Sequence, residues 1–166
     1  MNASTDLAAT VVERMAAHGL TLATCEASVG GLIGHLITDV PGASRIFVGG
    51  IAPYAREPKV GLLQVDDAML TTEGQVSEAA VLALARGPRE VMGSDLAIAE
   101  TGMASDTGNP LRPAGLYFVA LAAEGHERAL RCQFEGTRQE NKRQAAEAAL
   151  RLVLAYLDET QTGDSA

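Results

Sequence analysis

Segments with helical periodicity alternate in this chain with short, mostly apolar segments, and this alternation limits the possible folds more than any other feature. Residues 6–18 carry apolar side chains at helical spacing, whereas residues 21–25 form a short, mostly apolar segment that follows Gly19. Short apolar segments between turns are typical of buried strands. The predicted order is helix 6–18, strand 21–25, helix 30–38, strand 45–51, helix 58–64, helix 78–92, strand 95–99, strand 115–122, strand 127–134 and a last helix that runs to about residue 157. We therefore expect an α/β fold: a single layered domain with a mixed sheet and helices packed on its faces.

Length and composition favour one globular domain. The chain has 166 residues, of which 47% are hydrophobic and 20% are charged. These proportions exclude disorder over most of the chain. We expect one domain over residues 1–159 and a disordered tail over residues 160–166.

The charge balance argues against some classes of partner. The chain carries 21 acidic and 13 basic residues, a formal net charge of -8. Nucleic acids and anionic membranes both attract basic proteins, so neither is an expected partner.

Because neither a signal peptide nor an apolar run of roughly 18 residues is evident, a cytoplasmic location is predicted. Cys25 and Cys132 match no zinc motif; a disulfide is open, but two free thiols in a reducing compartment are favoured.

The segment 24–31 leads from a predicted strand into a helix start that contains Gly30 and Gly31. Backbone N–H groups at a helix start favour anions, and ligands of open α/β sheets bind at the carboxyl ends of strands. A small residue or a nucleophile in this segment would lie at such a strand end. The alternative to a ligand site is that this segment is only a tight strand-to-helix turn, which needs glycine for packing.

Two further segments carry candidate polar groups. Lys59 is one of only two lysines, against eleven arginines. A desolvated lysine can act as a general base where arginine cannot, although a solvated surface lysine is the alternative. The segment Glu100–Gly102 ends a predicted strand and enters a loop rich in Gly, Ser, Asp, Asn and Pro, which is typical of ligand sites; an ordinary connection is the alternative.

Arg138 and Arg143 lie near the start of the last helix, where Thr137 and Glu140 predict a capping box. Arginine beside helix N-terminal amides is a plausible phosphate site. The alternative is a helix face with ion pairs to acidic residues such as Glu147.

Together these segments resemble the C-terminal domain of the competence/damage-inducible protein CinA, the nicotinamide-nucleotide deamidase family. The resemblance covers residues 21 to about 154. It rests on 38–44 (Thr-Asp-Val-Pro-Gly-Ala-Ser), Gly49-Gly50-Ile51, Tyr54, Glu57, Lys59-Val60, Gly74, Val76-Ser77-Glu78, Asp95-Leu96, Thr101-Gly102, Pro113-Ala114-Gly115 and Gly136-Thr137-Arg138.

The resemblance implies a homodimer that hydrolyses the carboxamide of nicotinamide mononucleotide to nicotinate mononucleotide and ammonia. The reaction uses a serine nucleophile assisted by a lysine, without a metal or other cofactor. The resemblance also implies that Lys59 is the family's lysine and that Tyr54 and Thr101 are polar site residues. The residues expected to bind the substrate are Glu26, Gly30, Gly31, Gly102, Arg138 and Arg143.

The chain departs from the family at the nucleophile. The family motif is Ala-Glu-Ser-Cys-Thr-Gly-Gly, and here Glu26 and Gly30 fix its register without a gap. The nucleophilic serine therefore falls on Ala27, the cysteine on Ser28 and the threonine on Val29. Arg56 replaces the usual Asn, and the loop after Gly102 reads Met-Ala-Ser-Asp instead of Ile-Ala-Gly-Pro.

Two hypotheses follow. In the first, the chain is an active amidohydrolase in which Ser28 serves as nucleophile and Lys59 as base. In the second, it binds a pyridine nucleotide without cleaving it and has a regulatory role, because alanine has no oxygen with which to form an acyl-enzyme.

Overall fold

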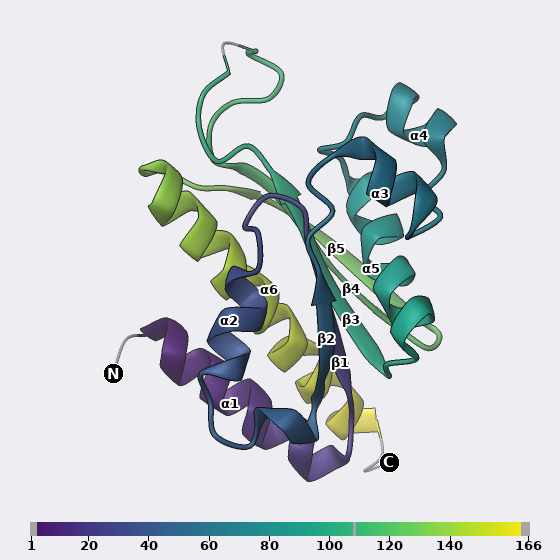
Figure 1. Ribbon diagram of the computed structural model, residues 1–166. Coiled ribbons are helices and arrows are strands. Elements are labelled where there is room, and N and C mark those ends of the chain that lie inside the picture. Colours follow the sequence, from purple (N-terminus) through teal and green to yellow (C-terminus); the bar gives the residue numbers. More distant parts are fainter. Residues whose placement is uncertain (1–2, 108, 164–166) are drawn as a thin grey trace.

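The computed structural model describes residues 3–107 and 109–163. In this part of the chain a five-stranded mixed sheet has the strand order β2-β1-β3-β4-β5 (Figure 1). Strand β1 runs parallel to both β2 and β3, whereas β4 runs antiparallel to β3 and β5. The strands are β1 (Leu22–Glu26), β2 (Phe47–Ile51), β3 (Leu96–Gly102), β4 (Leu116–Ala123) and β5 (His126–Gln133). The helices are α1 (Ala3–His18), α2 (Leu32–Thr38), the 3-10 helix η1 (Ala43–Arg45), α3 (Arg56–Gly61), α4 (Asp67–Thr72), α5 (Glu78–Met92) and α6 (Arg138–Gly163).

Helices cover both faces of the sheet, as the sequence predicts. Helices α1, α2 and α6 pack on one face, and α5 packs on the other with α3 and α4 nearby (Figure 1). The alternation of side chains along each strand divides the core accordingly. On β4, Val119 and Leu121 join the cluster under α1, α2 and α6, while Ala120 and Ala122 join the cluster under α5.

Several predicted elements are confirmed. Helix α5 spans the predicted 78–92, and Ser77 caps it by accepting a hydrogen bond from the N–H of Ala80 at 3.1 Å. Pro88 lies inside this helix and does not interrupt it. The two predicted strands 115–122 and 127–134 form the antiparallel pair β4–β5, and the capping box of α6 is present: Glu140 accepts a hydrogen bond from the N–H of Thr137 at 2.7 Å.

Other boundaries differ from the prediction. Helix α4 was not predicted, since six residues are too few for a periodic pattern. Helix α2 begins at Leu32, because Gly30 and Gly31 have left-handed φ angles of 71° and 98°. Helix α6 continues to Gly163, so residues 160–163 of the expected tail are helical, and residues 164–166 lie outside the described residues.

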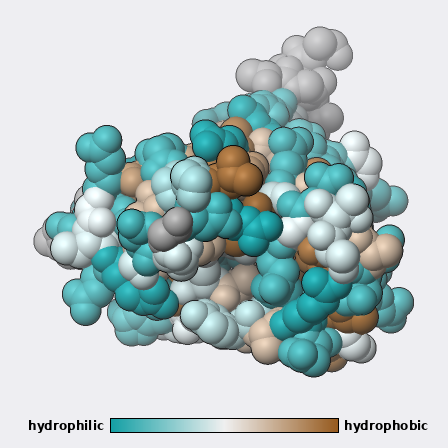
Figure 2. Space-filling model, turned by 90° about the horizontal axis from the view of Figure 1, so that it is seen from above, coloured by the Kyte–Doolittle hydropathy of each residue, from teal (hydrophilic) through white to brown (hydrophobic). Residues whose placement is uncertain are grey.

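The extent of β3 matters most for the site. The predicted strand 95–99 continues to Gly102, so Glu100 and Thr101 lie within the sheet. Since β1 and β3 are parallel, their carboxyl ends meet at one edge, where the long loop after β3 also begins (Figure 1). Figure 2 looks down on this edge and shows a mostly hydrophilic surface with small, separate apolar areas. Within the described residues, no helix is both long and apolar enough to span a bilayer.

Candidate functional site

A cavity of about 280 Å³ lies at the carboxyl ends of β1 and β3. It is lined by Ser28, Tyr54, Lys59, Thr101, Gly102 and Arg138, all predicted site residues. A larger cavity of about 550 Å³ lies between the loop after α3 and helix α5, and no predicted site residue lines it. The smaller cavity is therefore the candidate site.

Ser28 is bound to a carboxylate from the neighbouring strand. Its hydroxyl donates a short hydrogen bond to Oε2 of Glu100. The other carboxylate oxygen, Oε1, accepts from the backbone N–H of Ser28 at 2.7 Å and from that of Val29 at 2.8 Å. Glu100 thus fixes both the turn after β1 and the direction of the serine hydroxyl.

Glu100 is fully buried, with 0% of its surface exposed. Burial raises the pKa of Glu100, the hydrogen bonds from Ser28 and Val29 act in the opposite direction, and the nearby Glu26 adds to the rise. In the sequence, Glu100 belongs to a segment that ends a predicted strand and enters a loop typical of ligand sites, but its carboxylate was given no role of its own. A charged residue within an otherwise apolar strand was the available indication that it needs a specific partner.

Glu26 was expected to bind substrate, but it does not line the cavity. Its carboxylate is buried and accepts from the backbone N–H groups of Ile33 and Gly34, both at 2.8 Å, and from the Thr24 hydroxyl at 3.1 Å. A carboxylate on these N–H groups stabilises the first turn of α2. Its observed contacts therefore give Glu26 a structural role.

Lys59 is buried in α3, with 3% of its surface exposed, so the surface-lysine alternative is wrong. Its Nζ donates to Oε1 of Gln75 at 2.9 Å. Burial lowers the pKa of Lys59, while Cys25 and Glu100 nearby act to raise it. The cavity thus contains a desolvated amine whose proton is easier to remove than that of a surface lysine.

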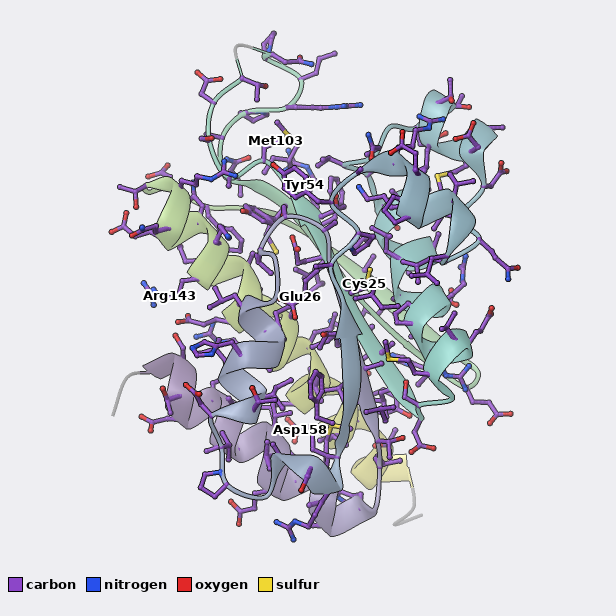
Figure 3. The ribbon with its side chains drawn as sticks, in the orientation of Figure 1. Cys25, Glu26, Tyr54, Met103, Arg143 and Asp158 are labelled. Carbon is purple, nitrogen blue, oxygen red and sulfur yellow. The ribbon has the colours of Figure 1, made fainter. Side chains whose placement is uncertain are left out.

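The remaining polar groups of the cavity come from separate elements. Tyr54 is 70% exposed at the rim, and Figure 3 shows it beside Met103 at the upper end of the sheet. The hydroxyl of Thr101 donates to the backbone oxygen of Gln75 at 2.8 Å. Arg138, at the start of α6, donates from Nη1 to the Ser105 hydroxyl at 3.0 Å. Gln75 was not predicted, and nothing in its sequence neighbourhood singles it out.

Gly30, Gly31 and Arg143 lie elsewhere, contrary to the expectation that they share one site with Ser28. They line a second cavity of about 530 Å³ between α2 and the first turns of α6. Arg143 forms an ion pair with Glu147 at 2.8 Å, the alternative that the sequence left open. Figure 3 shows Arg143 on the flank of α6, away from Tyr54.

Two of the departures from the family pattern also lie outside the candidate cavity. Arg56 turns toward α4, where its guanidinium pairs with Asp67 at 2.7 Å. Val29 is buried in the core under α2 and lines the second cavity. Of the other departures, Ala27 and the loop residues Met103 and Ser105 line the candidate cavity beside Ser28, whereas Asp106 does not.

Both cysteines are free thiols, which resolves the choice left open by the sequence. Cys25 is buried, and desolvation raises its pKa, so its thiol stays protonated. Among the described residues, no group of three or more His, Cys, Asp and Glu side chains could hold a metal ion.

The family model of the CinA C-terminal domain matches residues 4–157. This chain belongs to the CinA C-terminal domain family. A CinA-like protein of Syntrophotalea carbinolica is 40% identical over 152 residues, which cover 91% of this chain and 37% of that protein. A CinA-like protein of Gemmatimonas aurantiaca is 40% identical over 163 residues, which cover 97% of this chain and 38% of that protein. The chain thus spans less than two fifths of the length of these curated relatives.

Solved CinA structures share the whole fold. The competence/damage inducible protein CihA of Agrobacterium tumefaciens superposes with a TM-score of 0.91 at 27% identity, covering 95% of this chain and 97% of that chain. A CinA superfamily protein of Klebsiella pneumoniae superposes with a TM-score of 0.91 at 26% identity, covering 95% and 99% of the two chains. The predicted fold class is therefore confirmed.

Proposed function

We propose that this CinA-family protein hydrolyses the carboxamide of nicotinamide mononucleotide to nicotinate mononucleotide and ammonia, with Ser28 as the nucleophile. The observation that carries the proposal is the hydrogen bond from the Ser28 hydroxyl to a buried carboxylate, in a cavity that also contains a buried lysine. A nucleophile hydrogen-bonded to a base is the arrangement required for acyl transfer. The identity of the substrate is inferred from the family resemblance.

Each further group in the cavity has a role in this reaction. Arg138 supplies a cation for the phosphate. Tyr54 offers an exposed aromatic ring against which the pyridine can stack, and Thr101 helps to position the carboxamide. Arg138 comes from α6, Thr101 from β3 and Tyr54 from the loop before α3, and all three line the same cavity as Ser28.

A second candidate function is nucleotide binding without cleavage. Ala27 favours it, because the family's nucleophilic serine falls on this residue. The backbone N–H groups of Ser28 and Val29, which could otherwise stabilise an oxyanion, are also already bonded to Glu100. In this case the cavity would hold the nucleotide for a regulatory purpose.

Ammonia release from nicotinamide mononucleotide distinguishes the two functions. The purified protein, Ser28→Ala and Ala27→Ser are compared at equal concentration, with binding measured by calorimetry. Turnover by the wild type that Ser28→Ala reduces by about 10³-fold or more supports the hydrolase. A silent wild type that binds the nucleotide, beside an active Ala27→Ser, supports the binding function instead.

The homodimer also comes from the resemblance and is part of this proposal. Light scattering on the purified protein tests it: a mass twice that of the 17.2 kDa chain supports the dimer, and a monomer mass contradicts it.

A further inference from the structure

We propose that Glu100 is the proton acceptor of the reaction, so that the catalytic pair is Ser28–Glu100 and Lys59 acts through its charge. This inference rests on the proposed function for its substrate, but the pairing itself is independent of which carboxamide or ester is cleaved. Lys59 as the base, which the resemblance implies, is the competing assignment.

The contacts of Glu100 divide between its two oxygens. Oε1 is held by the backbone N–H groups of Ser28 and Val29, at 2.7 and 2.8 Å. Oε2 receives the hydroxyl of Ser28. The carboxylate is therefore held at two points on one oxygen and presents the other oxygen to the hydroxyl proton. This is the geometry of a preorganised general base.

Lys59 is engaged differently. Its Nζ donates to Oε1 of Gln75, so its observed partner is a side-chain amide. The backbone amides near Ser28 are occupied by Glu100, and a cation inside the cavity then remains to stabilise the negative charge on the carbonyl oxygen in the transition state. A neutral lysine could not supply that charge.

Glu100 interacts electrostatically with four other titratable side chains. Glu26 and Cys25 come from β1, Lys59 from α3 and Tyr117 from β4. Burial and the Glu26 carboxylate raise the pKa of Glu100, which moves this carboxyl toward the pH at which a general base works best. Burial and the Glu100 carboxylate raise the pKa of Tyr117 to about 12, so the phenol stays neutral.

The steps balance without a further reactant. The Ser28 oxygen bonds to the carboxamide carbon while its proton passes to Oε2 of Glu100. The carbon–nitrogen bond then breaks, and the proton on Glu100 goes to the departing nitrogen, which leaves as ammonia. Water attacks the acyl-serine and gives a proton to Glu100; as the carbon–oxygen bond to Ser28 breaks, that proton returns to the serine, and the acid product is released.

The variant Glu100→Gln distinguishes a role of Glu100 as general base from a role as structural support of the turn. Its amide oxygen can still accept from the N–H groups of Ser28 and Val29, so the turn keeps its support. Its amide nitrogen then faces the hydroxyl and cannot take a proton. Glu127→Gln is the matched control, because Glu127 lies at the other end of the sheet and pairs with Arg86.

The test uses two readouts on the folded, full-length protein. The first is the rate at which an alkyl fluorophosphonate labels Ser28 between pH 5 and pH 9, followed by intact mass and peptide mapping. The second is ammonia release from nicotinamide mononucleotide. We expect Glu100→Gln to slow both by about 10²–10⁴-fold and to remove the acidic limb of the labelling profile, while Glu127→Gln matches the wild type.

The possible outcomes test the Ser28–Glu100 pair separately from the choice of nicotinamide mononucleotide as substrate. Labelling of Ser28 that depends on Glu100, without ammonia release, supports the pair and rejects nicotinamide mononucleotide as substrate. Equal labelling of wild type and Glu100→Gln overturns the inference, as does a wild-type protein in which Ser28 is not labelled. Loss of labelling in Lys59→Met together with an unchanged rate in Glu100→Gln assigns the base to Lys59 and also overturns it.

Discussion

Glu26 and Glu100 are register partners on the parallel strands β1 and β3, and both carboxylates are buried. Each accepts two backbone N–H groups from the segment that follows β1: Glu26 from Ile33 and Gly34, and Glu100 from Ser28 and Val29. The nearby Glu26 carboxylate adds to the cost of ionising Glu100. The pair therefore fixes the turn that carries Ser28, and it makes this end of the sheet sensitive to pH.

The free energy of unfolding should show this sensitivity. The pKa of Glu100 in the folded protein lies above its ordinary value of 4.5. The unfolded chain therefore releases this proton first as the pH rises, and Glu100 progressively destabilises the fold between pH 4.5 and its raised pKa. Denaturant titrations from pH 4 to pH 8 should show a loss of stability in the wild type relative to Glu100→Gln. A difference between the two proteins that stays constant with pH would contradict this.

Lys59→Met should lower kcat with little change in KM. The substitution keeps most of the side-chain volume and removes the charge that stabilises the oxyanion, for which we expect a loss of about 10²–10³-fold. Because burial lowers the pKa of Lys59 from 10.5, wild-type activity should fall as the pH rises through that lowered value. Steady-state kinetics from pH 6 to pH 11 measure both effects, and an unchanged kcat in the variant would reject this role.

Arg138 and Arg143 should differ in their effect on substrate binding. Arg138 lines the candidate cavity, whereas Arg143 pairs with Glu147 beside the second cavity. We expect Arg138→Ala to raise KM for nicotinamide mononucleotide by about 10-fold or more, the loss of one charged hydrogen bond, and Arg143→Ala to leave KM close to that of the wild type. A similar rise in both variants would mean that the second cavity takes part in substrate binding.

Gly102→Ala should destabilise the fold, because a Cβ atom at this position would lie 2.2 Å from the ring of Tyr117. That ring is fully buried and packs against the tilted ring of Phe134, with centroids 5.7 Å apart, so it has little room to move. We expect a loss of about 1–3 kcal/mol in the free energy of unfolding. Gly61→Ala is the control, since its Cβ would meet no atom within 4 Å. Equal stability of the two variants would contradict the close contact.

Local features of the sequence predicted much of the fold. Ser77 marks the start of α5, and Thr137 with Glu140 marks the start of α6, because a cap depends on residues only a few positions apart. Helix α4 was missed because it is too short to show a period. The end of β3 was misplaced because charged and polar residues at 100 and 101 resemble a loop.

The candidate site was predicted only in part. Resemblance to a family marked Ser28 and Lys59, which the fold brings to one cavity. The partner of Ser28 lies 72 residues away, and only the register of β1 against β3 places it there. Gly30 and Gly31 lie two and three positions after Ser28 in the sequence, but both have left-handed φ angles and line the second cavity. Distance along the sequence therefore hid a partner of Ser28 and wrongly added its near neighbours to the site.

The most direct test of the account is to detect the acyl-enzyme. The protein is mixed with excess nicotinamide mononucleotide, quenched in acid within milliseconds to seconds, and mapped by mass spectrometry. The account predicts a nicotinate mononucleotide acyl group on Ser28, absent from Ser28→Ala and strongly reduced in Glu100→Gln. An adduct on another residue, or ammonia release that persists in Ser28→Ala, would contradict it.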